Sequence, residues 1–287
     1  LINMYDFDID FVSATFRGST NDGSCGVRPW HFALDAMWQT YGLINLSDAF
    51  LLLTRNGYPL SSEDDATLRD FLRRLVEAVN SSFHAWTRWA DAHPRSPSYE
   101  RYRSDNHLSW CLAGIMAGAV ALEDDELMEY CLHGGTWVDR KAGAYKNPSP
   151  ITDVIDRAIE SGTGSANEGR FYEEKINRNP PLGYAMFHLW PMSLVLLQAE
   201  IHRGEDLWTF KGSDGAGVEN AFDRYAGHLL GERSTGGENL QNHRWLWELG
   251  FRRFKKDRYR RVILVGPRNQ YILQSIGPVA ILATDSF

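Results

Sequence analysis

Apolar residues recur every three or four positions along most of the chain, which is the spacing of one face of a helix. This spacing, together with the capping residues, glycines and prolines around it, predicts a succession of helices. They cover residues 30–41, 45–53, 61–92, 107–121, 123–133, 153–160, 184–202, 215–230 and 242–254. Because modest loops join them, we predict an all-α protein of stacked antiparallel helical hairpins. An incomplete α/α barrel, or toroid, is one closed form of that arrangement.

The other segments show little helical pattern. Residues 1–29 and 94–103 are polar and are predicted to be loops, and residues 139–170 are less regular. The tail after residue 261 holds short apolar runs between Gly and Pro, which could be strands or short helical turns, and we expect the tail to be irregular or β-like. No low-complexity linker divides the chain, and one domain over residues 1–287 is therefore predicted.

Composition narrows the classes of protein. Hydrophobic residues make up 43% and charged residues 23%, as in a globular protein with a substantial core. The net charge of −7 argues against nucleic-acid binding. We expect charges to interrupt every apolar stretch before it could span a membrane, and we expect a monomer. The ten Trp and twelve Tyr suit either sugar-binding surfaces or helix packing.

The three cysteines leave two arrangements open. Cys25, Cys111 and Cys131 lack the spacing of metal ligands. Either one disulfide and one thiol, or three thiols, would fit the sequence.

The first candidate for chemistry is a junction between a polar loop and an apolar helix. Asp105 or Asn106 is placed to cap the helix, and His107 falls in its first turn. The positive end of a helix disfavours a protonated imidazole, so His107 is expected to be neutral and able to take up a proton. The alternative is a structural cap followed by an incidental His.

The second candidate is also a junction between a polar segment and an apolar helix. A charged segment with Arg178 leads through Pro180-Pro181 into an apolar helix that begins near Tyr184. An Arg beside a Tyr hydroxyl would favour the phenolate. The alternative is that Tyr184 packs in the core and Arg178 is a surface charge.

Together the two junctions resemble the alginate lyase family, in which Asn-His opens an apolar helix and an Arg shortly precedes a Tyr at the start of an aromatic helix. The likeness covers roughly residues 106–202 and extends more faintly to residues 242–254. The family includes mannuronate-specific alginate lyases, and related families cleave glucuronan. The resemblance implies an α/α-toroid fold and a secreted or periplasmic polysaccharide lyase that acts on an anionic uronic-acid polymer.

The chain departs from the family pattern in three places. Asp105 stands where the family often has Asn, and Ala185 stands where the family's Tyr is commonly followed by His. Residues 140–169 look like an insertion. These differences make a glucuronan-type substrate at least as plausible as alginate.

β-Elimination on a 4-linked uronate removes the C5 proton and expels the C4 oxygen. It requires a neutralised carboxylate, a base and an acid. The resemblance assigns neutralisation to Asn106 and Arg178. In mannuronate or glucuronate the proton and the leaving oxygen share a face, so Tyr184 serves as base and acid and His107 assists. In guluronate or iduronate they lie on opposite faces, and His107 would be the base. The chemistry needs no metal, and we predict no cofactor.

Aromatic and cationic side chains near the junctions are candidates for contact with the sugar, although packing is an alternative role for each. These candidates are Trp86, Arg88, Trp89, Trp110, His188 and Trp245, with His133 and His243 as further supporting residues.

Two other functions remain open. A glycoside hydrolase on an α/α barrel would need two carboxylates, and Asp105, Glu173, Glu174 and Glu248 are available but have no distinctive setting. A non-catalytic carbohydrate-binding or helical scaffold protein would share the Trp surplus. It would have no reason to gather Asn106, His107, Arg178 and Tyr184 in one place.

Overall fold

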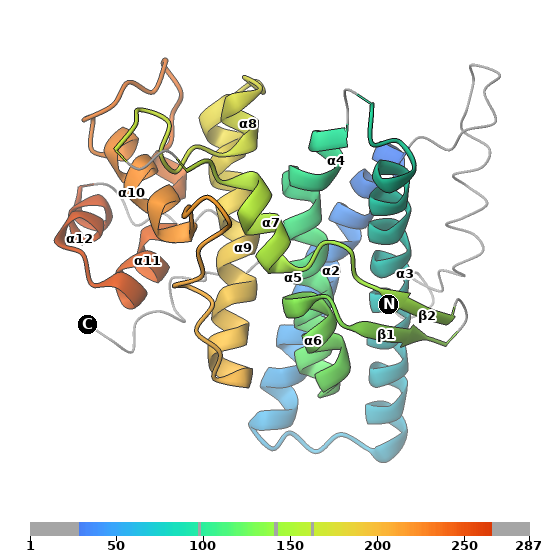
Figure 1. The fold of residues 1–287 in the computed structure, drawn as a ribbon. Helices are drawn as coiled ribbons and strands as arrows, with labels where there is room; N and C mark the ends of the chain where they lie inside the picture. Colours follow the sequence, from blue (N-terminus) through green and yellow to red (C-terminus); the bar gives the residue numbers. More distant parts are fainter. Residues whose placement is uncertain (1–28, 97–98, 141–142, 162–163, 266–287) are drawn as a thin grey trace.

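The computed structural model describes residues 29–96, 99–140, 143–161 and 164–265 (Figure 1). Helices dominate this part of the chain, so the prediction of an all-α protein is confirmed. The longer helices are α2 (Pro29–Arg55), α3 (Ser62–Ala92), α5 (Asn106–Leu122), α9 (Pro181–Arg203) and α10 (Val218–Leu229). The shorter ones are α4 (Tyr99–Ser104), α6 (Asp125–His133), α7 (Ile151–Ala158), α8 (Tyr172–Lys175), α11 (Leu246–Phe254) and α12 (Asp257–Leu264), with a 3-10 turn at Gln241–His243. Closure into a toroid stays a prediction.

Helix α5 lies at the centre of the packing. It contacts α2, α3 and α9, which run beside it in Figure 1, and every residue from Asn106 to Ala121 is buried. Small residues on α5 allow this close approach. A Cβ on Gly114 would lie 2.8 Å from Thr40 Cγ2, and one on Gly118 would clash with Val76 Cγ2. A helix that is apolar all round is therefore buried all round, as its sequence predicts.

Capping residues set several helix ends where the sequence predicts them. The Ser61 side chain accepts a hydrogen bond from Asp64 N at 3.0 Å and begins α3. Asp124 does the same for Leu127 N at 2.9 Å and begins α6, which ends at Gly134 in the left-handed conformation with φ of 81°. Each side-chain oxygen satisfies an N–H that has no partner within its helix.

Two local predictions are wrong, and the structure decides a third that the sequence left open. Residues 29–55 form one helix, α2, and Gly42 does not end it. A glycine inside a helix costs about 1 kcal/mol, which the packing of α2 against α3 and α5 outweighs. Within the predicted loop at 94–103, α4 begins at Tyr99. For the apolar run at 262–265, the sequence left a strand and a helical turn open; the run ends helix α12, with Val262 and Ile263 buried in the core.

A short β-hairpin has no counterpart in the sequence prediction. Strands β1 (Thr136–Asp139) and β2 (Gly143–Lys146) pair antiparallel beside α6. Trp137 is buried, and Arg73 of α3 lies over its ring at 4.6 Å. The burial of β1 alternates along the strand, but its exposed Val138 and buried Asp139 reverse the usual order of apolar and polar residues, so the sequence does not indicate a strand.

Helix α9 corrects the expectation that charges interrupt every apolar stretch. No Asp, Glu, Lys or Arg occurs between Pro181 and Ala199, and by length and composition alone this helix could cross a membrane. Most of that stretch is buried inside the protein, as in the core helix of a globular fold.

Two of the three cysteines lie in the described residues. Cys111 and Cys131 are buried and are not joined to each other. Burial raises the pKa of the Cys111 thiol to about 12, so this side chain stays protonated and unreactive at neutral pH. Cys25 and the apolar runs at 271–273 and 279–282 lie outside the described residues.

Candidate functional site

The two junctions meet at the carboxylate of Asp105. Asp105 caps α5, and one of its oxygens contacts His107 Nδ1 and accepts from His107 N at 3.0 Å. Its other oxygen accepts from Arg178 Nη1 at 3.1 Å. Arg178 in turn stacks on Tyr184, with Cζ 3.9 Å from the ring centroid. With Asn106, these residues form what we call the junction cluster: Asp105, Asn106, His107, Arg178 and Tyr184.

Asp105 is ionised in this setting. Its burial opposes ionisation, but the charge and hydrogen bond of His107 and the charge of Arg178 outweigh that penalty and hold the pKa of this carboxyl well below its usual range. Asp105 and His107 are both buried, whereas Arg178 and Tyr184 are partly exposed. The cluster therefore has a rigid, charged interior and an accessible side at Tyr184.

The contact with Asp105 sets the orientation of His107. A carboxylate accepts hydrogen bonds, so Nδ1 must carry a proton where it faces Asp105. In the neutral ring the lone pair then lies on Nε2, the nitrogen suited to take up a proton.

Asn106 presents a buried amide without a protein partner. Its side chain is 1% exposed, and neither Nδ2 nor Oδ1 makes a hydrogen bond to any residue that the structure describes. An unpaired buried polar group costs about 1–3 kcal/mol. A substrate carboxylate that reached Nδ2 would satisfy it.

A buried contact between a Glu and a His, which the sequence prediction missed, holds the start of α5. Glu173 is fully buried, accepts from Asn106 N at 2.8 Å, and lies 3.0 Å from His188 Nδ1 through each of its oxygens. His188, expected to contact the sugar, is 0% exposed and instead joins α9 to α8 and α5. The prediction of His188 as a sugar contact is therefore corrected to a supporting role within the core.

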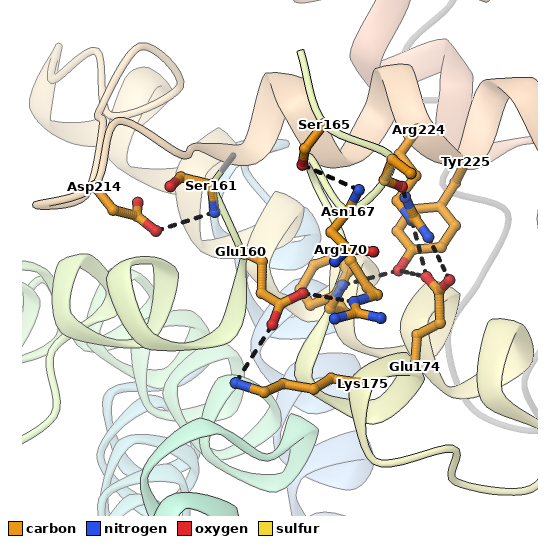
Figure 2. A network of polar contacts seen from close by, with 12 residues as sticks. Glu160, Ser161, Ser165, Asn167, Arg170, Glu174, Lys175, Asp214, Arg224 and Tyr225 are labelled. Atoms are coloured by element: carbon orange, nitrogen blue, oxygen red, sulfur yellow. Dashed lines mark hydrogen bonds and ion pairs between the residues drawn. The ribbon is translucent and has the colours of Figure 1, made fainter. Parts of the chain in front are cut away.

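Helix α8 is fixed from both sides (Figure 2). Arg224 of α10 donates to both oxygens of Glu174 at 2.5 and 2.9 Å, and the Tyr225 hydroxyl also donates to Glu174 at 2.9 Å. On the other side, Glu160 contacts Arg170 at 2.5 Å and Lys175 at 3.3 Å. These ties fix the segment that supplies Glu173 and Arg178.

The helix that carries Tyr184 has a carboxylate at its start. Pro180 and Pro181 begin α9 without a side-chain cap of their own. Glu238, far along the chain, accepts from Leu182 N at 3.1 Å and from Gly183 N at 2.8 Å. The Glu238 carboxylate accepts hydrogen bonds from N–H groups that have no partner within α9. Its negative charge also interacts favourably with the positive end of the helix dipole, next to Tyr184. No pattern in the sequence places Glu238 there.

The aromatic candidates for sugar stacking lie in the core. Trp110 is 0% exposed and packs 5.2 Å from Trp190, and Trp245 is 6% exposed and packs 4.7 Å from the same ring. A ring without an exposed face has no surface to cover a sugar, so both are corrected to packing residues. Trp86, Arg88 and Trp89 lie near the end of α3, and their side chains are outside the described part of the structure.

Ser165 lines two cavities, of about 310 and 380 Å³. Arg224, Arg233 and Arg258 line the first, together with Glu168 and Asp223, so charges of both signs face it. No member of the junction cluster lines either cavity. These two cavities are therefore separate from the junction cluster.

One group of the described residues has the donor set of a metal site. Glu129, His133 and Glu205 place their ligand atoms within 4.8 Å of one another. Arg203 already binds both of these carboxylates, at 3.4 and 3.2 Å, and His133 Nε2 lies 2.6 Å from Glu205. A guanidinium therefore compensates the negative charge, and the group is separate from the junction cluster.

A family model described as Alginate lyase matches residues 81–235, which is more than half of the chain and includes the whole junction cluster. No curated protein matches the chain.

Proposed function

Because the chain belongs to the alginate lyase family and is a polysaccharide lyase, we propose that it cleaves a 4-linked uronic-acid polymer by metal-independent β-elimination at the junction cluster. Mannuronate-rich alginate and glucuronan are the proposed substrates, encountered outside the cytoplasm. The observation that carries this proposal is the continuous contact from Tyr184 through Arg178 and Asp105 to His107.

The cluster offers each group that the reaction requires. The Asn106 amide, which has no hydrogen-bond partner among the described residues, is suited to bind the substrate carboxylate. That contact would draw charge from the carboxylate and make the C5 proton more acidic. Arg178 already binds Asp105 and the Tyr184 ring, so we assign it chiefly to orienting Tyr184.

Tyr184 is the proposed base and acid on mannuronate or glucuronate. Its deprotonated oxygen takes the C5 proton, the C5–H electron pair forms the C4–C5 double bond, and the C4–O bond breaks. The Tyr184 hydroxyl then gives the proton to the leaving oxygen and returns to its starting state. Both transfers occur on one face of the sugar, and the partial exposure of Tyr184 allows that face to approach.

Three of the four carboxylates considered for a glycoside hydrolase, Asp105, Glu173 and Glu174, do not suit its general acid. Such an enzyme needs one carboxylic acid with a raised pKa. At Glu174 burial raises the pKa, but the hydrogen bonds and charge of Arg224 outweigh it and lower the pKa overall, and the pKa of Asp105 is lowered as well. Glu173 is fully buried against His188. None of these three carboxylates suits a general acid.

The test is Tyr184→Phe, assayed on glucuronan, polymannuronate and oxidised cellulose by the ultraviolet absorbance of the new C4–C5 double bond. Loss of proton transfer should lower kcat by about 10²–10⁴-fold. Tyr58→Phe is the matched control, since Tyr58 is 60% exposed and distant in sequence from both junctions. If Tyr184→Phe keeps activity within about tenfold of the wild type, Tyr184 is not the proton-transfer group. If hydrolysis products without a double bond appear, the elimination mechanism is wrong.

A further inference from the structure

We propose that the cavity lined by Arg224, Arg233 and Arg258, here called the arginine cavity, is a second, non-catalytic binding site that holds one uronic-acid residue by its carboxylate. No member of the junction cluster lines it, so the site retains the polymer and takes no part in the elimination. The inference rests on the proposed function for the identity of its ligand, because the same polymer occupies both sites.

The first observation is that two of these arginines cross α10 at the same glycine. A Cβ on Gly227 would lie 3.0 Å from Arg258 Nη2 and 3.2 Å from Arg233 Cδ, so the missing side chain leaves room for both arginines. Guanidinium groups stay positively charged in proteins, and like charges repel one another at short range. An anion bound by both side chains relieves that repulsion.

The second observation is that both arginines keep donors that no described residue uses. In the described part of the chain, Arg233 donates only to the Ala166 carbonyl, at 3.3 Å from Nη1, and forms no ion pair. Arg258 binds Glu232 through Nη2, while its buried Nε has no hydrogen-bond partner among the described residues. Because each guanidinium has five N–H donors, a carboxylate in the cavity finds donors on two side chains.

The third observation is that the acidic residues of the cavity already have other partners. Glu168 accepts from Asn220 Nδ2 and from Gly164 N, both at 2.7 Å, and Asp223 binds Lys256. A carboxylate oxygen has further lone pairs, which accept hydrogen bonds from sugar hydroxyls. A uronic acid carries one carboxylate and several hydroxyls on one ring. It therefore matches this mixed lining better than a neutral sugar or an inorganic anion does.

The arginine cavity depends on a segment that departs from the family pattern. Ser165 and Glu168 belong to residues 140–169, which look like an insertion, and they line the cavity together with residues of α10 and α12. The volume of about 310 Å³ lies at the lower end of the range for ligand pockets, about 300–1,000 Å³, and suits a single sugar ring.

The loop after α10 links the arginine cavity to the start of α9. It carries Arg233 and then, five positions later, Glu238, which accepts from Gly183 N next to Tyr184. Five residues of chain reach at most about 18 Å, so the cavity lies near the helix start that carries the proposed catalytic group. A polymer held at both places binds more tightly than at either place alone, because the second contact becomes intramolecular.

The first experiment observes the arginine side chains directly. Nitrogen-15 NMR follows the Nε–H signals of Arg233 and Arg258 while glucuronate, methyl glucoside or sodium sulfate is added at constant ionic strength. Arg233→Lys and Arg258→Lys assign the two signals. Glucuronate should shift both along a saturable curve, methyl glucoside should shift neither, and sulfate should bind more weakly than glucuronate. Arg260, which is exposed on α12 and does not line the cavity, is the internal control and should not shift.

Arg233→Gln supplies the variant for the same titration. It removes a hydrogen-bonded charge partner, so the Kd for glucuronate, followed on the Arg258 signal, should rise by about tenfold or more. Since Arg233 is exposed and donates only to Ala166 among the described residues, the variant should fold, which circular dichroism establishes.

The second experiment measures whether the site retains the polymer that is cleaved. Arg233→Gln should raise KM for glucuronan or polymannuronate by about tenfold and leave kcat unchanged, because one of two linked contacts is lost and the junction cluster is intact. Arg260→Gln is the matched control, with the same change of charge, and should alter neither constant.

Four results would count against these proposals. Absence of a saturable shift with glucuronate, or an equal shift with methyl glucoside, removes the site and leaves the proposed function intact. Tighter binding of sulfate than of glucuronate identifies a site for inorganic anions and overturns the sugar assignment. An unchanged KM in Arg233→Gln overturns the retention of the polymer. Shifts with glucuronate in a protein that cleaves no uronan end the proposed function and leave a site for a sugar acid.

Discussion

The buried pair of Glu173 and His188 gives the sharpest prediction about stability. In Glu173→Ala, the Asn106 N–H and His188 Nδ1 lose their shared acceptor inside the core. A hydrogen bond to a charged group contributes about 1.5–3 kcal/mol, so two such donors imply a loss of about 3–6 kcal/mol. We expect Glu173→Ala to lose an amount in the lower part of that range, about 3–5 kcal/mol of unfolding free energy.

The assay is urea and thermal unfolding followed by far-ultraviolet circular dichroism. For a chain of this size the loss corresponds to a fall in Tm of roughly 6–20 °C. Glu173→Gln keeps one acceptor oxygen and should lose less. The exposed Glu126 provides the matched control, and Glu126→Gln should change stability by less than about 1 kcal/mol.

A double-mutant cycle with His188→Ala separates the pair from its surroundings. Since the two side chains are in direct contact, their coupling energy should exceed about 1 kcal/mol. A loss below about 1 kcal/mol in Glu173→Ala, or purely additive effects in the cycle, would refute the view that this pair holds α5, α8 and α9 together.

Two further predictions follow from Asp105, which belongs to the cluster, and from Glu238, which binds the helix start next to Tyr184. Because the pKa of Asp105 is lowered in the folded protein, its contribution to stability is present above the unfolded pKa of about 4 and is lost as pH falls through the folded value. Asp105→Asn should therefore flatten the loss of stability below about pH 4 in unfolding curves measured across acidic pH, and an unchanged slope would contradict this account. Glu238→Ala removes the acceptor at the start of α9 and should lower stability by about 0.5–2 kcal/mol. It should also lower kcat more than it raises KM, because it loosens the helix turn that carries Tyr184, and a change in KM alone would argue against that role.

The sequence by itself determined the class of fold and the places where chemistry is concentrated. Helical spacing and capping residues are local signals, since a cap such as Ser61 or Asp124 acts on N–H groups three residues away. The same local logic marked His107 and Tyr184 as polar groups at the starts of apolar helices. The motifs around them led to the family that the comparison with family models shows.

Only the tertiary structure decided which side chains support those two residues. Glu173 and Glu238 act across 67 and 56 positions of sequence, on Asn106 N and Leu182 N, and no local pattern encodes contacts of that length. The burial of Trp110 and Trp245 depends on the approach of separate helices, which a count of aromatic residues does not show. Asp105 could be predicted as a cap from its position. Its second bond, to Arg178, exists only because folding brings residues 105 and 178 together.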